Sequence, residues 1–343
     1  MQSIASAILD RYLTELKGIP QLLALLSEID TRVSPSNACI GGGKTALCVG
    51  SGNSLAIAHI LATELVERHK IAAEACTPYR AINGSLGPHM AYLLSASAVR
   101  REVWDCARVL LNKGSFVTLL TLNGSIEPPT EFNRRRFRVI RPANLSVGDS
   151  YLPILNTLGL FMLLFELFDL RSEALSFVNA SKSFLSAFGR NRSLYTLDKR
   201  SSVFVIIPSY GMRGAAIDLE TRIIKSGLSM ATIEDPSNLL HGRYMIFAGW
   251  KNKKYKEIAS AITIARAGEE RHLRNIVAKM PKRLSSVNFI STQSGLVGSG
   301  EGLMFSVLSF GSLLGAMRGK SPWKLLKWGN ELFLLDEPVP QKE

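Results

Sequence analysis

Short apolar runs alternate along the first half of the chain with longer stretches of helical periodicity. The apolar runs at residues 46–49, 71–75, 91–94 and 116–120 predict strands, and a further strand is expected at 138–140. Apolar positions with helical spacing occur at 55–69 and 100–112, between these runs. This order predicts a parallel sheet that is covered by helices on both faces, and therefore an α/β fold.

The same order begins again in the second half of the chain. Strands are predicted at 203–207, 229–233, 244–248 and 286–290, and helices at 215–225 and 254–267. The polar and basic segment 186–201 is the expected connection between the halves. We therefore expect two α/β domains, at residues 36–190 and 191–335, followed by a tail at 336–343.

Three further segments have a pattern of their own. Residues 4–29 have the apolar spacing of one or two amphipathic helices, interrupted at Gly18 and Pro20, within an N-terminal segment 1–35. Residues 152–168 predict a long apolar helix. The Ser- and Gly-rich run 294–300 is predicted to be a flexible turn that serves as a lid or a linker.

Composition agrees with two folded domains. The chain has 343 residues, of which 46% are hydrophobic and 20% are charged, so sizeable cores can form. The longest apolar run, 158–168, contains Glu166 and is too short to cross a bilayer. The N-terminus lacks the order of basic and apolar residues found in a secretory signal. We expect a cytoplasmic protein with no membrane partner.

The residues that usually bind metals show no ligand spacing. None of the four cysteines forms a CxxC pair, and the histidines at 59, 69, 89 and 272 are far apart in the sequence. Cys48 and Cys106 lie in apolar surroundings and are expected to be core thiols. The sequence therefore predicts neither a metal nor a cofactor.

The formal net charge of +13 favours anionic partners, such as phosphate esters, nucleotides or nucleic acid. A basic surface without such a partner is the alternative. Part of the charge is concentrated in two clusters, and neither has the interleaved aromatic residues of a base-stacking surface. The clusters are Arg134, Arg135, Arg136, Arg138 and Arg141, and Lys251, Lys253, Lys254 and Lys256.

Two turns that follow predicted strands have the composition of a phosphate-binding site. Small residues let backbone N–H groups approach a phosphate, and the N-terminus of the next helix favours an anion. The first turn supplies backbone groups, and in the second Ser95 and Ser97 supply hydroxyl groups. Ordinary strand-to-helix turns are the alternative reading of both. The first turn consists of Gly50, Ser51, Gly52, Asn53 and Ser54.

Three segments together resemble the SIS (sugar isomerase) family. Residues 48–54 resemble its G-x-G-[TS]-S turn, and residues 93–98 resemble its serine-rich S-x-S-G loop, which holds the sugar phosphate. Glu220 followed by the segment 239–242 resembles the E…HGP signature of the isomerase half of glucosamine-6-phosphate synthase and related aldose–ketose isomerases. Residues 323–334 are similar to the closing segment of two-domain members, so the resemblance covers about residues 40–335.

The resemblance implies two tandem SIS domains, each a flavodoxin-like three-layer sandwich. It also implies a phosphorylated sugar or a nucleotide-like anion as the ligand, and a homodimer or tetramer. The family's loop glycine is Ala98 here, and Arg100 adds a charged donor that the family loop does not have.

For catalysis, the resemblance implies that His241 acts in ring opening and that Glu220 is the nearest candidate for the base that moves a proton between the sugar's first two carbons. The synthase has its catalytic glutamate about two turns further along the helix, where this chain has Lys225, Ser226 and Gly227. Arg243 replaces the proline of the signature.

Three functions follow from these observations. The first is a protein that binds a phosphorylated sugar or a related carbohydrate derivative without turning it over. The second is an active aldose–ketose sugar-phosphate isomerase or a sugar-phosphate deaminase. The third is a basic scaffold that binds nucleic acid or a partner protein.

Overall fold

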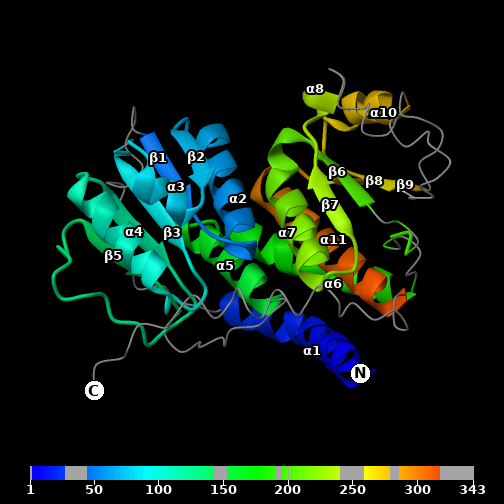
Figure 1. Cartoon of the computed structure of the whole chain (residues 1–343), viewed down its shortest axis with the longest axis horizontal. Coiled ribbons are helices and arrows are strands. Elements are labelled where there is room, and N and C mark those ends of the chain that lie inside the picture. The colour runs from blue at the N-terminus through cyan, green and yellow to red at the C-terminus, as the bar shows by residue number, and fades with distance from the viewer. Residues whose placement is uncertain are drawn as a thin grey trace. The chain divides into compact units, whose positions relative to one another are not determined.

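Each half of the chain forms a parallel β-sheet of its own in the computed structural model (Figure 1). The structure describes residues 2–27, 45–85, 87–142, 153–190, 195, 197–199, 201, 203–239, 259–278 and 286–316. These residues divide into two units. The N-terminal unit contains residues 15–178, and the C-terminal unit contains residues 179–316 together with the start of the first helix, up to Thr14. The fold class is α/β with two parallel sheets flanked by helices, as the sequence predicts.

The N-terminal unit has a five-stranded parallel sheet with the order β2-β1-β3-β4-β5. All five residues of the central strand β3 are buried. Burial on both faces explains why this strand is a continuous apolar run instead of an alternating one. The strands are β1 (Thr45–Val49), β2 (Ala72–Cys76), β3 (Met90–Leu94), β4 (Phe116–Leu120) and β5 (Phe137–Ile140).

Helices cover both faces of this sheet and give it three layers. One face packs against α3 (Pro78–Asn83) and α4 (Arg101–Asn112), where Leu93 and Leu119 pack with Trp104 of α4. Side chains alternate between the faces of a strand, so Cys48 and Tyr92 point to the other face. That face is covered by α2 (Asn53–Glu67), which contacts α5 (Leu155–Leu167). The helix α6 (Arg171–Arg190) follows.

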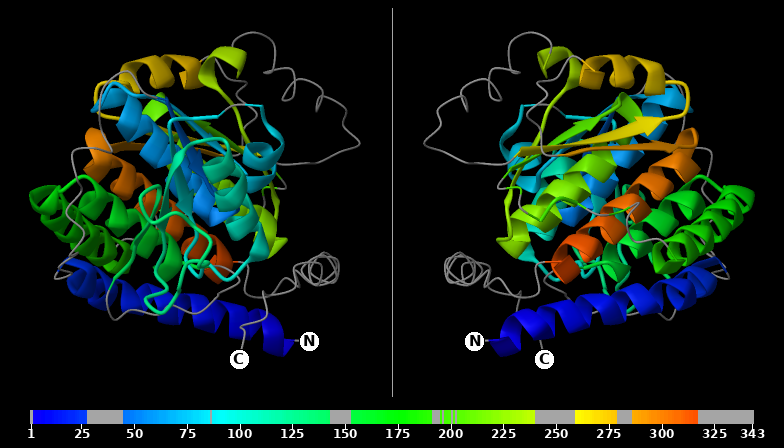
Figure 2. Two further views of the ribbon diagram at one scale, coloured as in Figure 1. Left: turned by 90° about the vertical axis from the view of Figure 1, so that its left-hand side faces the viewer. Right: turned by 90° about the vertical axis from the view of Figure 1, so that its right-hand side faces the viewer.

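The C-terminal unit has a four-stranded parallel sheet with the order β7-β6-β8-β9. On one face, α7 (Arg213–Ser226) packs against α11 (Gly295–Ala316). On the other face, Leu273 and Ile276 of α10 (Glu270–Ala278) pack on Val205 and Ala261, and Figure 2 shows these layers. The remaining elements are β6 (Val203–Pro208), the 3-10 helix η3 (Tyr210–Met212), β7 (Met230–Ile233), α8 (Pro236–Asn238), β8 (Ala259–Arg266) and β9 (Ser286–Thr292).

The helix predicted near the middle of the second half is wrong. The helix predicted over 254–267 is instead the strand β8 over its described part, Ala259–Arg266. The alanines of this segment are good helix formers, but the segment pairs in parallel with β6 and β9, and Ser260, Ala261, Ile262 and Ala265 are buried in the resulting sheet. The predicted strand 244–248 lies outside the described residues.

The Ser- and Gly-rich run 294–300 is a helix and not the predicted flexible turn. It begins α11, in which residues 296–311 are all buried. A Cβ atom at Gly302 of the same helix would lie 2.9 Å from the Cβ atom of Ala215 in α7. The small residues therefore let two helices pack closely, which a pattern of turn-forming residue types does not reveal.

Two other features differ from the prediction in detail. The N-terminal segment is one helix, α1 (Gln2–Ser27), which continues through Gly18 and Pro20. The predicted connection 186–201 begins inside α6, which extends to Arg190. The long apolar helix predicted at 152–168 is confirmed as α5.

The helix α11 is long and apolar enough to span a membrane. However, 89% of its most apolar stretch is buried inside the structure. Burial of this extent is typical of the central helix of a protein core.

Candidate functional site

The turn after β1 requires glycine at its first position. Gly50 directly follows Val49, and its N–H donates a hydrogen bond to the carbonyl oxygen of Cys76, at 3.1 Å. A Cβ atom at Gly50 would lie 2.5 Å from the carbonyl oxygen of Ser54. The chain therefore turns from β1 into α2 within van der Waals contact of its own backbone, and any side chain would open the turn.

The rest of this turn forms the N-terminus of α2. Gly52 is the N-cap residue with a φ of 55°, a left-handed conformation that glycine adopts without strain, and it supplies no side-chain cap. Ser51 is exposed, whereas Gly52 and Ser54 are half-buried. Asn53 is buried, with a relative exposure of 5%. Backbone and serine groups, and not the Asn53 side chain, thus line the accessible part of the turn.

The turn after β3 is held in shape by its own hydrogen bonds. The Ser95 hydroxyl accepts a hydrogen bond from the N–H of Ala98, at 3.1 Å. Ala98 has a φ of 52°, the left-handed conformation that favours glycine, and its carbonyl oxygen accepts from Trp104 Nε1 at 3.0 Å. Ser95 and Ser97 are half-buried. The alanine therefore holds a backbone conformation that glycine would adopt without strain.

Two residues after β4 support this turn and were missed in the sequence. Thr121 donates from its hydroxyl to the carbonyl oxygen of Ala96, at 2.9 Å. Asn123 donates from Nδ2 to the carbonyl oxygen of Ser97, also at 2.9 Å. Their position directly after a buried strand could have marked them as candidate site residues in the sequence. That they lie beside the turn after β3 follows only from the strand order, in which β4 is the neighbour of β3.

The two turns lie side by side at the point where the order of strands reverses. In the order β2-β1-β3-β4-β5, the chain moves outward in opposite directions from β1 and β3. The two strands pair in parallel, with Val49 opposite Leu93, so Gly50 and Leu94 follow at the same edge. In open α/β sheets, ligands bind outside the carboxyl ends of the strands at this switch point.

Arg100 lies at the beginning of the helix that follows the second turn. It is the N-cap residue of α4, has an extended backbone and is half-buried. The next residue, Arg101, is exposed and pairs with Asp105, with Nε and Oδ2 3.3 Å apart. Arg100 therefore adjoins the Ser95–Ala98 turn, whereas Arg101 interacts along the helix.

The predicted catalytic residues belong to the C-terminal half of the chain. Glu220 is half-buried on α7, and burial raises the pKa of its carboxyl group above the ordinary value. A backbone hydrogen bond at Ile233 and the charge of Arg213 act in the opposite direction on this pKa. His241 lies outside the described residues. The eight predicted ligand-binding residues belong to the N-terminal unit, and Glu220 belongs to the C-terminal unit.

The corresponding switch point of the C-terminal unit contains one of the chain's own arginines. Ser209, after β6, accepts a hydrogen bond from the N–H of Arg266, at 3.0 Å. A Cβ atom at Gly211 would lie 2.8 Å from Arg266 Nη1, and Arg266 Nη2 is 3.1 Å from Glu269 Oε1. The Arg266 side chain fills the space beside Gly211, and its charge is paired with Glu269. The N-terminal unit is therefore the better candidate for an anion site.

Titratable groups elsewhere do not form a metal site in the part of the chain that the structure describes. No group of three or more His, Cys, Asp or Glu residues that could hold a metal ion occurs there. Three described cysteines are buried and free, and burial raises the pKa of Cys76 to about 11 and of Cys106 to about 12. These thiols are therefore uncharged at neutral pH and contribute to the core.

The chain is similar to known proteins in its fold but not in its sequence. No protein-family model and no curated protein matches the sequence. Solved structures do match over nearly the whole chain. Tagatose-6-phosphate ketose/aldose isomerase from Escherichia coli has a TM-score of 0.68 and 13% identity, covering 91% of this chain and 94% of its own.

Two further structures are similar to the same extent. Glucosamine-6-phosphate deaminase from Thermotoga maritima has a TM-score of 0.65 and 15% identity, covering 96% of this chain and 98% of its own. The C-terminal domain of glucosamine-fructose-6-phosphate aminotransferase from Francisella tularensis has a TM-score of 0.64 and 12% identity, covering 90% and 96%. The chain therefore has the fold of phosphosugar isomerases and SIS-domain proteins. At these identities the likeness concerns the fold alone.

Proposed function

We propose that the protein binds a phosphorylated sugar or a related carbohydrate derivative at the turns after β1 and β3, without turning it over. The observation that carries this proposal is the position of two small, polar turns on either side of the switch point. The similar structures named above are enzymes of phosphorylated sugars by their names, which agrees with this ligand class.

Hydrogen-bond donors at the two turns suit a phosphate group. The N-terminus of α2 carries partial positive charge and has no side-chain cap from Gly52. The Ser95 oxygen already accepts from the N–H of Ala98, so its own hydrogen is left to donate to a ligand oxygen. The Ser97 hydroxyl adds a second donor, and Arg100 adds positive charge beside the same turn.

An active aldose–ketose isomerase is the second candidate. It is favoured by the raised pKa of the half-buried Glu220, because a carboxyl group with a raised pKa is a stronger base than an exposed one. In this function Glu220 and His241 form the acid–base pair. The departures of the chain from the family signature around residues 225–227 and at Arg243 place binding without turnover first.

The same proposal includes the organisation of the chain. The two α/β units correspond to two tandem SIS domains, for which we keep the boundaries 36–190 and 191–335. A cytoplasmic location and a homodimer or tetramer are in keeping with a ligand of this class. Light scattering coupled to size exclusion measures the oligomeric state directly.

The test of ligand binding is a thermal-shift screen against hexose, pentose and heptose phosphates, amino-sugar phosphates and nucleotide sugars. A ligand at about 100 times its Kd stabilises the folded protein by about 2.7 kcal/mol, which raises the Tm measurably. We expect the rise with one class of phosphorylated sugar and its loss in Ser97→Ala and in the double variant Ser95→Ala with Ser97→Ala.

The matched control is Ser176→Ala, which removes a hydroxyl from an exposed position of α6. It should respond to the ligand as the wild type does. Absence of any shift with every ligand class would contradict the proposal. Turnover of the bound sugar phosphate that is lost in His241→Ala and Glu220→Gln would favour the isomerase over the binding protein.

A further inference from the structure

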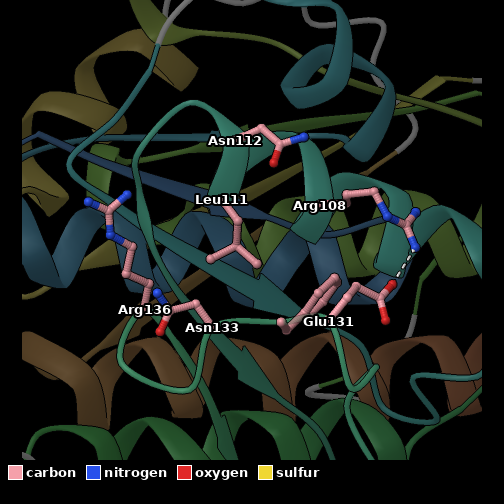
Figure 3. Close-up of a pocket in the computed structure, with 7 residues that line it drawn as sticks. Arg108, Leu111, Asn112, Glu131, Asn133 and Arg136 are labelled. Atoms are coloured by element: carbon pink, nitrogen blue, oxygen red, sulfur yellow. Dashed lines mark hydrogen bonds and ion pairs between the residues drawn. The ribbon is translucent and has the colours of Figure 1, made fainter.

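A pocket of the N-terminal unit lies away from the two turns. Its volume is about 350 Å³, and it is bounded by the last two turns of α4 and by the turn that precedes β5. Figure 3 shows Leu111 between Asn112 and Asn133, with Arg136 on one side and Arg108 with Glu131 on the other.

Strand direction separates this pocket from the proposed sugar-phosphate site. All five strands run in the same direction, and the two turns follow the carboxyl ends of β1 and β3. In contrast, Asn112 ends α4 just before β4 begins, and Arg136 directly precedes β5. The pocket therefore lies toward the amino edge of the sheet, opposite the switch point.

The acidic group of the pocket is already paired within the protein. Arg108 Nη2 lies 3.1 Å from Glu131 Oε1, and Arg108 Nη1 lies 2.8 Å from Asp105 Oδ1. This pair forms one wall, drawn with a dashed line in Figure 3. Arg108 is shared between the two carboxylates, so Glu131 is partly neutralised, and it lies on the opposite side of the pocket from Arg136.

That other side is strongly basic. Arg134, Arg135 and Arg136 are consecutive and all exposed. Within the described residues, their guanidinium groups take part in no ion pair or hydrogen bond. The Arg136 guanidinium lies near Gly114, with Nη1 4.0 Å from the position of a Cβ atom there. Of these three positive charges, Arg136 lines the pocket, and Arg134 and Arg135 belong to the same turn.

The turn that carries these arginines is held by hydrogen bonds. The side-chain oxygen Oδ1 of Asn133 accepts from the N–H of Arg135, at 2.9 Å. Its carbonyl oxygen accepts from the N–H groups of Arg136 and Phe137, both at 2.8 Å. These hydrogen bonds fix the backbone of the turn, so the backbone loses less entropy when the arginines bind a ligand.

The floor of the pocket is apolar and its rim carries amide groups. Phe132 is buried, packs edge-on against Phe137 at 4.9 Å between ring centroids, and lines the pocket with Leu111. Asn112 is exposed at the end of α4, and Asn133 Nδ2 remains a donor because Oδ1 serves the turn. A nucleobase has apolar faces that can pack on such a floor and hydrogen-bonding edges that can reach the amide groups of the rim.

From this combination we propose that the pocket is a second anion site that takes a nucleoside phosphate, either free or within a single RNA strand. The base lies over Leu111 and Phe132, with its edge at Asn112 and Asn133. Its phosphate contacts Arg136, and further phosphates contact Arg134 and Arg135. This site is additional to the sugar-phosphate site and does not depend on it.

The test is a titration of the full chain with three probes. These are AMP, a single-stranded RNA of about ten nucleotides, which spans one to two typical binding sites, and ribose 5-phosphate, which lacks the base. In the double variant Ser95→Ala with Ser97→Ala, which removes the proposed sugar-phosphate site, we expect AMP or the RNA to bind and ribose 5-phosphate to bind at least about tenfold more weakly. Arg136→Ala and Asn112→Asp should each weaken binding about tenfold, because a charged hydrogen bond is lost or a negative charge is introduced.

The matched control is Arg80→Ala. It also removes one positive charge from the N-terminal unit, but Arg80 lies on α3, and its side chain pairs with Glu74 at 67% exposure. Binding should be retained in this variant. Tighter binding of AMP than of the RNA identifies a free nucleotide as the ligand, and the reverse identifies an RNA strand; either supports the site.

Three results would overturn the proposal. They are no binding of AMP or RNA, equal binding of ribose 5-phosphate and AMP in the double variant Ser95→Ala with Ser97→Ala, and equal loss of binding in Arg80→Ala and Arg136→Ala. Thermal shifts with sugar phosphates on the same variants keep the two sites apart. We expect the pocket variants to bind no nucleotide but still to be stabilised by a sugar phosphate. We expect Ser97→Ala to bind the nucleotide but not to be stabilised by a sugar phosphate.

Discussion

At the scale of single residues, local backbone geometry decides which side chain a position accepts. Ala98 adopts a φ of 52° at a position where glycine would be unstrained. Two hydrogen bonds hold Ala98 in this conformation: its N–H donates to Ser95, and its carbonyl oxygen accepts from Trp104. A non-glycine residue in this conformation costs about 1–2 kcal/mol, which the surrounding structure must supply. Such strain is often found at binding sites.

The pKa of Glu220 gives a prediction at the same scale. Burial raises this pKa in the folded protein, so the charged form is disfavoured there and the folded state loses stability as pH rises through the ordinary value. Glu220→Gln removes this loss. We expect the variant to gain stability relative to the wild type as pH increases from about 4 to about 7, measured by urea unfolding.

The control for this prediction is Glu127→Gln, at a carboxylate that is 81% exposed. Its stability relative to the wild type should change much less over the same range. A relative stability of Glu220→Gln that falls with increasing pH would show that Arg213 and the hydrogen bond at Ile233 dominate over burial.

At the scale of elements, close helix packing explains sequence features that look like loops. The helix α11 contains six glycines among its 22 residues and is still the central helix of its unit. In α7, beside it, Asp218 and Arg222 are both fully buried and paired, with 2.7 Å between Arg222 Nε and Asp218 Oδ2. Ser306 of α11 donates to the same Asp218 oxygen at 2.7 Å. Small residues and the hydrogen bond from Ser306 to Asp218 thus hold the two helices together.

Two glycines of α11 make this account testable. At Gly302 a Cβ atom would overlap the Cβ atom of Ala215, so Gly302→Ala should destabilise the protein by about 1–3 kcal/mol. At Gly315 a Cβ atom would meet no described atom within 4 Å apart from its neighbours in the helix, so Gly315→Ala should stabilise the helix by about 0.5–1 kcal/mol. Chemical unfolding measures both, and equal effects of the two substitutions would contradict close packing at Gly302.

At the scale of the whole molecule, charge is the dominant property. A net charge of +13 gives a basic protein whose surface repels itself. Part of this charge is paired, as in Arg68 with Glu173 at 2.8 Å, but among the described residues the side chains of Arg134, Arg135 and Arg136 form no ion pair. An excess of one sign favours anionic ligands and weakens the folded state at low salt.

Salt should therefore stabilise this protein. Raising the NaCl concentration from about 20 to about 300 mM shortens the screening length severalfold and reduces repulsion between exposed charges. We expect the Tm to rise by a few degrees, and to rise further in phosphate than in chloride of equal ionic strength, because phosphate also binds anion sites. A Tm that falls with added salt would mean that ion pairs outweigh the repulsion.

The sequence by itself determined the fold class and the strands of the N-terminal sheet. Buried parallel strands are continuous apolar runs, and Gly50 and Ser95 directly follow two of them, so pattern and turn chemistry were sufficient there. The pattern did not determine β8 or the start of α11, because an apolar run such as 259–266 and a glycine-rich run such as 294–300 fit more than one structure.

Only the tertiary structure decided which residues come together. Strand order places the turns after β1 and β3 at one edge, and it brings Thr121 and Asn123 beneath the second of them. It also places the basic turn 133–136 against the end of α4, more than twenty positions away in the sequence. These contacts depend on which strands are neighbours, and that order follows from how complete helices and strands pack and not from local sequence.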